Sequence, residues 1–269
     1  MQKTILITGA TDGIGFETAK MLVKQGHYVL LHGRNEDKLK KVEQALLVHC
    51  ETAQFKSYRA DLSNMSDVLG LAQALTKNHQ HLDILINNAG VYSASNELTV
   101  DGLDPRFAVN TIAPYLLTKT LLTLMDKYSR VLNLSSAAQA TVNLDALRGL
   151  VTLNDSEAYA QSKLALTIWS RVVGLQLKNR GPIIIAINPK SLLGSKMVKE
   201  AFGISGSDLS LGAEILCQAA LCDDFANASG LYFDNDYEKF ADPHPDALDE
   251  SICQGVMDSI VEIQQKLIA

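Results

Sequence analysis

Short apolar runs alternate with longer amphipathic stretches from one end of the 269-residue chain to the other. The apolar runs predict strands near residues 3–8, 27–32, 54–60, 83–87, 129–135, 182–187 and 229–233. The amphipathic stretches predict helices near residues 13–25, 36–49, 64–79, 105–126, 156–179, 209–222 and 246–266. No Pro/Gly/Ser-rich linker, low-complexity segment or internal repeat interrupts this alternation. We therefore expect one α/β domain over residues 1–269, a doubly wound parallel sheet of about seven strands with helices on both faces.

The residues that follow the predicted strands carry most of the functional information, because ligands bind beyond the carboxyl ends of the strands in such a sheet. In chain order these segments read TGATDGIG, HGRNEDKL, ADLS, NNAG, SSAA and NPKSLLGS. Every one of them is polar or contains glycine. The pattern predicts a shared ligand crevice along one edge of the sheet.

Three glycines, Gly9, Gly13 and Gly15, separate the first predicted strand from the first predicted helix. Glycine lets the backbone approach a ligand closely, and the N–H groups at a helix start favour negative charge, so this turn suits a phosphate. The spacing differs from GxxxxGK(S/T), since no lysine follows Gly15, and from GxGxxG, since three residues separate Gly9 from Gly13. At this point an ordinary strand-to-helix turn is an equal alternative.

The charge of the chain argues against a nucleic-acid partner. Its formal net charge is −6, and it has no basic stripe that could neutralise phosphates. No apolar run approaches about 18 residues, so we expect no membrane span. The first strand begins within three residues of the N-terminus, which leaves no room for a signal peptide. These features predict a soluble, cytoplasmic protein.

The cysteines and histidines predict no metal site. The four cysteines, at positions 50, 217, 222 and 253, form no CxxC pair, and their place in helical stretches suits buried thiols in a reducing compartment. The one close histidine pair, His79 and His81, ends a polar helix without a set of partner ligands. We interpret this pair as a solvated helix end.

The end of the second predicted strand indicates which dinucleotide the crevice would hold. An NAD-binding fold usually places Asp or Glu here, to accept hydrogen bonds from the ribose 2′-OH. Gly33 occupies this position instead and Arg34 follows, which leaves space and supplies bidentate donors for a 2′-phosphate. This favours NADP(H), with NAD(H) possible. Two observations oppose it: Arg34 can be an ordinary surface arginine, and the charge of Asp12 in the glycine turn does not suit a phosphate.

A tyrosine four residues before a lysine is a candidate catalytic pattern. On a helix, positions i and i+4 share a face, so the ammonium can stabilise phenolate and lower its pKa, which makes tyrosine a proton donor near neutral pH. Two pairs have this spacing, Tyr115 with Lys119 and Tyr159 with Lys163. Packing in a long apolar helix explains Tyr115. The second pair lies close to the two serines of SSAA, and we select it for that reason.

Three segments together resemble the short-chain dehydrogenase/reductases, over nearly the whole chain. TGATDGIG is similar to that family's TGxxxGxG cofactor turn, NNAG to its strand-four motif, and YAQSK to its YxxxK signature. The resemblance implies Tyr159 as the acid/base, Lys163 as the group that lowers its pKa and holds the nicotinamide ribose, and Ser136 as the hydroxyl that orients a carbonyl. It selects Ser136 over Ser135, and it implies that Asn110 in FAVNTIAPY supports a water-linked proton path to the lysine.

The same resemblance implies a Rossmann-type cofactor crevice. In it Asp61 of ADLS contacts adenine and Asn88 lines the cleft, with a helix N-terminal acid as the alternative for Asp61. The implied cofactor-binding residues are Gly9, Thr11, Asp12, Gly13, Ile14, Gly15, Arg34, Asn35, Asp61, Leu62, Asn88, Ala89, Gly90, Tyr159, Lys163 and Pro189.

Two features distinguish this chain within the family. The 22 residues between Ser136 and the catalytic tyrosine, with SGLYFDND and HPDALDE near the C-terminus, look most like the retinol-dehydrogenase-like branch, which favours NADP. Where members commonly have Pro-Gly, Lys190 follows Pro189, and Ser195 stands one residue away from the usual threonine. Because lysine carries a Cβ and a charge, we expect altered nicotinamide contacts and an altered substrate lid, roughly residues 191–207.

The sequence therefore predicts an oxidoreductase that transfers a hydride between NADP(H) and a carbonyl or alcohol substrate, with reduction favoured. An apolar pocket for a small substrate is suggested by Tyr92, Leu144, Leu147, Leu192, Leu193, Met197 and Phe202, although ordinary packing also explains them. The alternatives are a nucleotide-sensing protein without turnover and a structural oligomerisation module. The resemblance also implies a homodimer or homotetramer through the helices near 105–126 and 156–179.

Overall fold

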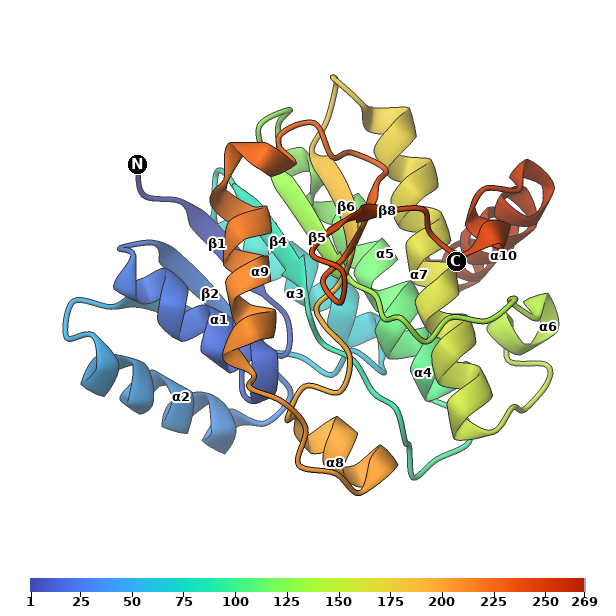
Figure 1. Ribbon diagram of the computed structural model, residues 1–269, viewed down its shortest axis with the longest axis horizontal. Helices are drawn as coiled ribbons and strands as arrows, with labels where there is room; N and C mark the ends of the chain where they lie inside the picture. The colour runs from blue at the N-terminus through green and yellow to red at the C-terminus, as the bar shows by residue number, and fades with distance from the viewer. Residues whose placement is uncertain (269) are drawn as a thin grey trace.

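The computed structural model describes residues 1–268, apart from the side chains of Phe202 and Ile268. Within that range eight strands form one sheet in the order β3-β2-β1-β4-β5-β6-β7-β8, and only β8 runs antiparallel to its neighbour (Figure 1). The strands are β1 (Thr4–Ile7), β2 (Tyr28–Gly33), β3 (Gln54–Arg59), β4 (Ile84–Asn87), β5 (Arg130–Leu134), β6 (Ile183–Asn188), β7 (Tyr232–Asp234) and β8 (Lys239–Ala241). The predicted doubly wound α/β sheet is confirmed, with eight strands in place of about seven.

Helices cover both faces of this sheet. They are α1 (Gly13–Lys24), α2 (Glu36–His49), α3 (Met65–Asn78), α4 (Pro105–Phe107), α5 (Ala113–Leu121), α6 (Leu144–Leu147), α7 (Asp155–Leu177), α8 (Lys196–Phe202), α9 (Ser210–Leu221) and α10 (Glu250–Ile268). α1, α2 and α9 pack on one face, and α3, α5 and α7 on the other (Figure 1). Successive strand residues alternate between the faces, so Leu6 joins the core under α3 and α5 while Ile5 and Ile7 join the opposite one. Burial on both faces explains why the strands read as continuous apolar runs.

The long helix predicted over residues 105–126 is interrupted. Between α4 and α5 the chain forms a π-helical segment, η1 (Ala108–Ile112), and a 3₁₀ turn, η2 (Leu122–Leu124), follows α5. Pro114 has no N–H to donate to the carbonyl of Asn110 four residues earlier, so the regular α-helical ladder cannot continue through this point. Single-turn π segments often occur at functional sites, and this one contains the predicted Asn110.

Three short elements escaped the sequence prediction: α6, α8 and β8. β8 has three residues at the edge of the sheet, and its exposed Lys239 and Phe240 lack the buried apolar pattern of the other strands. The seventh strand begins at Tyr232, later than predicted, because Gly230 turns with a φ of +79° just before it. α8 lies inside the segment predicted as a substrate lid.

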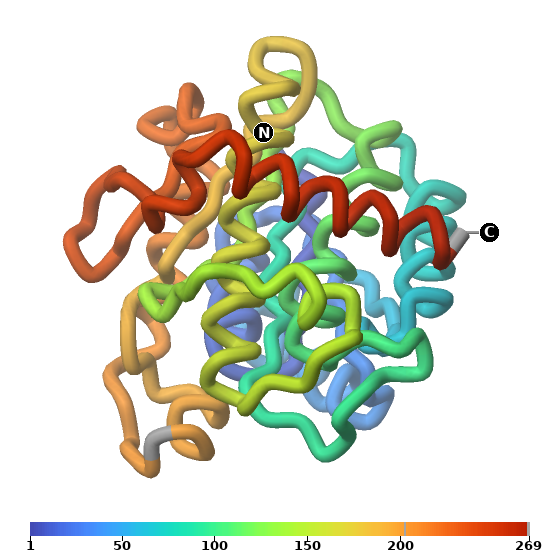
Figure 2. Tube along the Cα trace, turned by 90° about the vertical axis from the view of Figure 1, so that its right-hand side faces the viewer, coloured from blue at the N-terminus to red at the C-terminus, as the bar shows by residue number. Residues whose placement is uncertain are grey.

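The C-terminal helix α10 packs across α7 and α6 (Figures 1 and 2). Its buried side chains Val256, Ile260 and Ile263 share one hydrophobic core with Trp169 of α7. Part of the α7 surface is therefore covered within the chain. The expected self-association through α5 and α7 stays a prediction, limited to the surface that α10 leaves open.

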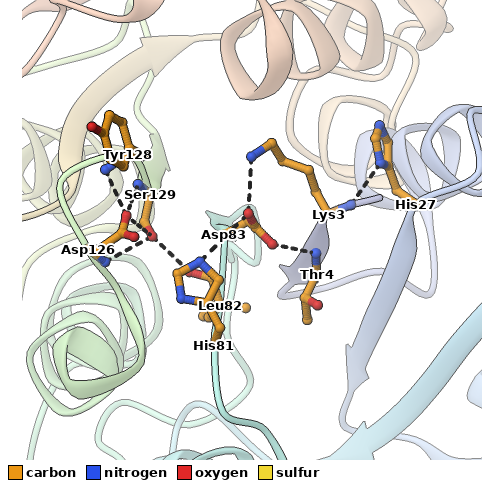
Figure 3. A network of polar contacts seen from close by, with 9 residues as sticks. All are labelled: Lys3, Thr4, His27, His81, Leu82, Asp83, Asp126, Tyr128 and Ser129. Atoms are coloured by element: carbon orange, nitrogen blue, oxygen red, sulfur yellow. Dashed lines mark hydrogen bonds and ion pairs between the residues drawn. The ribbon is translucent and has the colours of Figure 1, made fainter. Parts of the chain in front are cut away.

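A polar network closes the amino edge of the sheet, opposite the crevice (Figure 3). The carboxylate of Asp83 accepts hydrogen bonds from Nζ of Lys3 at 3.0 Å and from the backbone N–H of Thr4 at 2.8 Å, and it lies 3.7 Å from His81. A ring nitrogen of His79 lies 2.7 Å from the Tyr58 hydroxyl. His79 caps the end of α3 and His81 is exposed, as the prediction of a solvated helix end requires, and the His79 ring has Tyr58 as an additional partner.

The cysteines are unpaired, and two of them are buried. Cys217 and Cys253 lie in the core, Cys50 is half-buried, and Cys222 is exposed, which differs from the expectation of four buried thiols. Among residues 1–268 no three His, Cys, Asp or Glu side chains are arranged to hold a metal ion. Over the same range no helix combines the length and apolar character needed to cross a bilayer.

Candidate active site

The glycine turn and the loop after β4 pack directly against each other. Gly9 and Gly13 have positive φ angles of +66° and +55°, which favour glycine. A Cβ on Gly9 would lie 2.9 Å from Cα of Ala89, and a Cβ on Gly15 would lie 2.4 Å from Nδ2 of Asn88. The turn thus needs glycine both for its conformation and for this close approach.

Asn88 and Thr8 fasten these two segments together. The side-chain amide of Asn88 donates to the carbonyl oxygens of Thr8 at 2.9 Å and Gly9 at 3.1 Å. In return the Thr8 hydroxyl oxygen accepts the backbone N–H groups of Asn88 at 3.0 Å and Ala89 at 3.1 Å. The amide nitrogen of Asn88 therefore shapes the glycine turn, together with Thr8, which sequence reasoning did not select.

A buried histidine, His32, supports the same turn from β2. Its Nδ1 accepts the Gly9 N–H at 3.2 Å, and its Nε2 lies 3.1 Å from the carbonyl oxygen of Ala60, to which it donates as the neutral tautomer. Burial lowers the pKa of His32 to about 4, so the ring stays neutral. Sequence reasoning missed His32; the only available signal was its position at a strand end, directly before Gly33.

Asp12 and Asn35 use their side chains as helix caps. Asp12 precedes α1 and accepts the Gly13 N–H at 2.8 Å, while Asn35 precedes α2 and accepts the Lys38 N–H at 2.9 Å. Ile14, in the first turn of α1, is half-buried beside Gly212 of α9. These two polar side chains thus position the helix starts that border the crevice.

A hollow between the ends of β2 and β3 and the start of α3 is lined by Arg34, Arg59 and Asp61. Both arginines are exposed. The space left by the missing Cβ of Gly33 is not open, because that Cβ would lie 2.5 Å from the methyl group of Thr11. The prediction that Gly33 itself leaves room for a phosphate is therefore corrected. The guanidinium groups of Arg34 and Arg59 line the hollow beside Gly33, where they could contact a phosphate.

Asp61 stabilises a turn ahead of α3. Its carboxylate accepts hydrogen bonds from the backbone N–H of Ser63 at 3.0 Å and from the Ser63 hydroxyl at 2.8 Å. The cap of α3 is Asn64, so the alternative of Asp61 as a helix N-terminal acid is wrong. The side chain of Leu62 is buried in the core, and only its backbone can face a ligand.

Tyr159 and Lys163 lie one turn apart on α7 and face the carboxyl end of β5. Nζ of Lys163 donates a hydrogen bond of 2.6 Å to the carbonyl oxygen of Leu134 and lies 5.6 Å from the centre of the Tyr159 ring. The Ser136 hydroxyl acts on the Tyr159 phenol as a polar partner that lowers its pKa. On its other side, the ring centre of Tyr92 lies 5.1 Å from that of Tyr159. The other tyrosine-lysine pair is structural, since Tyr115 is buried against Trp169.

Burial controls the pKa values of both groups. It raises the pKa of Tyr159, an effect opposed by the hydrogen bond from Ser136 and reinforced by Tyr92. It lowers the pKa of Lys163 to about 8. The predicted lowering of the Tyr159 pKa by Lys163 is thus absent from this structure, because desolvation of the phenol dominates. The phenol is protonated at neutral pH.

The two serines after β5 have different surroundings. Ser135 is buried, and its hydroxyl lies 2.7 Å from the Thr167 hydroxyl on α7. Ser136 is half-buried, and its hydroxyl oxygen accepts the Ala138 N–H at 3.1 Å as well as contacting Tyr159. The structure therefore brings Ser136, and not Ser135, to the phenol.

Asn110 connects the loop after β4 to α7. Its Oδ1 accepts the Val91 N–H at 2.8 Å, and its Nδ2 donates to the Val91 carbonyl at 3.0 Å and to the Ser162 hydroxyl at 2.9 Å. The Ser162 hydroxyl donates in turn to the carbonyl oxygen of Tyr159 at 2.7 Å. Ser162, which precedes Lys163 in YAQSK, was missed by sequence reasoning and links Asn110 to α7.

Gly90 lies close to Asn110 and Lys163 on one side and to the predicted lid on the other. A Cβ on Gly90 would lie 3.4 Å from Oδ1 of Asn110, 3.5 Å from Nζ of Lys163 and 3.8 Å from Cε of Met197. Ser195 caps α8 by accepting the Val198 N–H at 3.2 Å. The segment 191–207 thus lies against the crevice.

These residues fit a dinucleotide. The glycine turn at the start of α1 suits a pyrophosphate, because it presents backbone N–H groups without side-chain obstruction. The hollow with Arg34 and Arg59 lies toward β3, and the tyrosine, lysine and serine lie toward β5. An extended ligand across the strand ends would reach both.

A sequence profile described as short chain dehydrogenase matches residues 3–203. The chain belongs to the short-chain dehydrogenase family. It is 30% identical over 271 aligned residues to retinol dehydrogenase 13 of Mus musculus, an alignment that covers 94% of this chain and 80% of that protein. This similarity agrees with the predicted retinol-dehydrogenase-like branch.

Several solved structures have a similar fold, and two of them are described here by their similarity to this chain. An uncharacterised protein from Mycobacterium paratuberculosis superposes with a TM-score of 0.81 at 24% identity, covering 98% of this chain and 94% of that one. The landomycin C-6 ketoreductase LanV, solved with bound NADP and rabelomycin, has a TM-score of 0.67 at 27% identity and covers 87% and 94%. The short-chain dehydrogenase described here is therefore an oxidoreductase acting on CH–OH or C=O groups with a nicotinamide cofactor.

Proposed function

We propose that this short-chain dehydrogenase is an NADP(H)-dependent carbonyl reductase or alcohol dehydrogenase with Tyr159 as its acid/base. The observation that carries the proposal is the grouping of Tyr159 with Ser136, whose hydroxyl lowers the pKa of the phenol, and with Lys163, whose Nζ lies 5.6 Å from the Tyr159 ring centre. The phenol and the hydroxyl lie together at the carboxyl end of β5, so a single carbonyl oxygen can contact both.

A bound nicotinamide supplies the hydride in reduction and accepts it in oxidation. In reduction the carbonyl oxygen gains negative charge; Tyr159 gives it a proton, and Ser136 donates a hydrogen bond to the same oxygen. Burial raises the pKa of Tyr159 and keeps the proton on the phenol at neutral pH, which suits reduction. Lys163, with a pKa of about 8, is mostly charged at neutral pH, and its ammonium would hold the nicotinamide ribose.

Asn110 supports the proton path by its position. Its side chain joins Val91 in the loop after β4 to Ser162 of α7. Because Pro114 lacks an N–H, the Asn110 carbonyl loses its ordinary α-helical donor. That oxygen is then suited to bind a water molecule that leads from Lys163 toward solvent.

The cofactor residues divide along the crevice. The turn of Gly9, Thr11, Asp12, Gly13, Ile14 and Gly15 would hold the pyrophosphate, and Arg34 with Asn35, Asp61 and Leu62 the adenosine half. Asn88, Ala89, Gly90, Tyr159, Lys163 and Pro189 would hold the nicotinamide half. The preference for NADP(H) rests on the exposed Arg34, with Arg59 beside the same hollow, and the absence of an acidic residue at the end of β2. The NADP bound to LanV supports it.

Some of the apolar side chains that the sequence suggested for a substrate pocket pack elsewhere in the protein. Leu147 and Leu193 are buried in the core, and Leu144 packs toward α10. Tyr92 beside Tyr159 and Met197 beside Gly90 are placed to contact a substrate. The side chain of Phe202 lies outside the described residues. A small apolar aldehyde, ketone or alcohol is the proposed substrate class.

An activity screen tests this proposal. Purified protein is mixed with NADPH and a panel of small apolar aldehydes and ketones, and cofactor oxidation is followed by absorbance. Turnover with NADPH that exceeds turnover with NADH supports the proposal. An absence of turnover across the panel, in both directions and with both cofactors, would contradict it.

A further inference from the structure

Lys190 adopts a backbone conformation that lysine rarely occupies. Its φ is +122°, and Leu192, two residues later, has a φ of +53°. Lys190 lies between the end of β6 and the predicted lid, and Leu192 lies at the start of that lid. For a residue with a Cβ this region is strained, and such conformations persist where the surrounding structure holds them.

The turn between β7 and β8 holds both peptide groups that flank Lys190. On one side Nδ2 of Asn235 donates to the Pro189 carbonyl oxygen at 2.9 Å. On the other side the carboxylate of Asp236 accepts the Ser191 N–H at 2.9 Å. Because each peptide unit is planar, these two bonds fix the rotation of the backbone about the Lys190 Cα.

Further bonds tie the same turn to the end of β6. The carboxylate of Asp236 accepts hydrogen bonds from the Ser191 hydroxyl and, at 2.9 Å, from Nδ2 of Asn188. The Asn235 N–H donates to the Asn188 carbonyl at 3.1 Å. Asn188 and Asn235 are buried, so the hydrogen bonds of these two side chains are shielded from water.

The charge of Asp236 is also supported. Partial burial opposes its ionisation, but hydrogen bonds from Ser191 and Asn188 and the charge of Lys190 together lower the pKa of the carboxyl group. Asp236 is therefore an anion at neutral pH, and its hydrogen bonds are of the stronger, charge-assisted kind.

We propose that Asn235 and Asp236 are positioning residues for the nicotinamide end of the cofactor pocket. They hold the turn of Pro189, Lys190 and Ser191 in a conformation that glycine would adopt freely, and so allow lysine to stand there. Without Asp236, Lys190 relaxes toward negative φ, which rotates the adjoining peptide groups and shifts the start of the lid. The inference rests on the proposed function, in which Pro189 contacts the cofactor.

The test compares the affinities of four variants for NADPH and for 2′,5′-ADP, which fills only the adenosine half of the pocket. Asp236→Ala is expected to weaken NADPH about tenfold and to change 2′,5′-ADP affinity by less than about twofold. Adding Lys190→Gly to Asp236→Ala is expected to restore the NADPH affinity to within about threefold of wild type. Glycine adopts a positive φ without hydrogen bonds that hold the backbone there. Adding Lys190→Ala, which removes the same charge but keeps Cβ, does not restore it. Lys190→Gly alone is the fourth variant and gives the reference affinity for the double variant that contains glycine.

Controls separate this role from general destabilisation. Asp242→Ala removes an exposed carboxylate beyond β8 and is expected to leave both affinities unchanged. Thermal unfolding verifies that each variant is folded; if Asp236→Ala is not, Asp236→Asn replaces it, with the same order of effects at smaller size because one acceptor oxygen is kept.

Three results would overturn the inference: unchanged NADPH affinity in Asp236→Ala, equal weakening of both ligands, or equal rescue by Lys190→Gly and Lys190→Ala. Failure of wild-type protein to bind either ligand is a different result, which overturns the proposed function and with it the premise about Pro189.

Discussion

Nζ of Lys163 lies 5.6 Å from the centre of the Tyr159 ring and donates a hydrogen bond of 2.6 Å to the carbonyl oxygen of Leu134. This bond ties α7 to the end of β5, the strand that leads into Ser136. The tyrosine and the lysine are therefore held on one helix that is tied to β5, and Ser136 follows two residues after that strand ends.

Tyr159→Phe removes the phenol oxygen and keeps the ring that packs on Tyr92. Because it removes the proton donor, we expect kcat to fall about 10²- to 10⁴-fold. NADPH affinity, measured by fluorescence, is expected to stay within about threefold, since the remaining cofactor contacts are untouched. A Phe variant with near wild-type turnover would remove Tyr159 from the mechanism.

Ser136→Ala and Ser135→Ala form a matched pair. Ser136 contacts Tyr159, so its loss is expected to lower kcat about 10²-fold with little change in melting temperature. Ser135 instead bonds Thr167 in the core, so its loss is expected to cost about 1 kcal/mol of stability and little activity. Steady-state kinetics and thermal unfolding of both variants distinguish the roles, and the reverse pattern would assign catalysis to Ser135.

Arg34→Ala tests the choice of cofactor. Loss of a charge-assisted contact to a 2′-phosphate is expected to weaken NADPH about 10- to 100-fold and to leave NADH within about twofold. Arg180→Ala removes an exposed arginine beyond α7 and serves as the control for net charge. Equal weakening of the two cofactors by Arg34→Ala would remove the 2′-phosphate argument.

His32 predicts a pH dependence of stability. Burial lowers its pKa in the folded protein to about 4, below the unfolded value of 6.5. Between these values the unfolded chain binds more protons, so the contribution of His32 is complete above pH 6.5 and is lost as pH falls toward 4. Complete loss amounts to about 3 kcal/mol.

Denaturant unfolding of wild type and His32→Asn from pH 7 to pH 4 measures this contribution. Asparagine does not titrate there, and its side-chain oxygen can accept the Gly9 N–H. The stability difference between the two proteins is expected to shrink as pH falls. A difference that stays constant would show that His32 is not the group responsible.

The strands and the catalytic spacing could be predicted from sequence because both depend on local pattern. Leu6 and Ile7 alternate between two buried faces, and Tyr159 and Lys163 share a helix face at any i, i+4 spacing. The serine pair at the end of the fifth predicted strand then distinguished this pair from Tyr115 and its lysine. Patterns of this kind can be recognised in the sequence without knowledge of the tertiary structure.

Other features depend on contacts between distant segments, which no local pattern carries. His32 matters because Gly9 and Ala60 reach it from two other strand ends. Lys190 tolerates a positive φ because Asn235 and Asp236, far along the chain, hold its neighbours. The pKa of Tyr159 likewise follows from burial that the sequence does not show.

The measurement that tests this account most directly is a fluorescence titration of the purified protein with NADPH and, separately, with NADH at matched ionic strength. NADPH is expected to bind saturably and clearly more tightly than NADH. Tighter binding of NADH would contradict the role of Arg34. It would leave unchanged the assignment of the protein as a nicotinamide-dependent enzyme. Binding of neither would contradict the central claim that this crevice holds a nicotinamide cofactor.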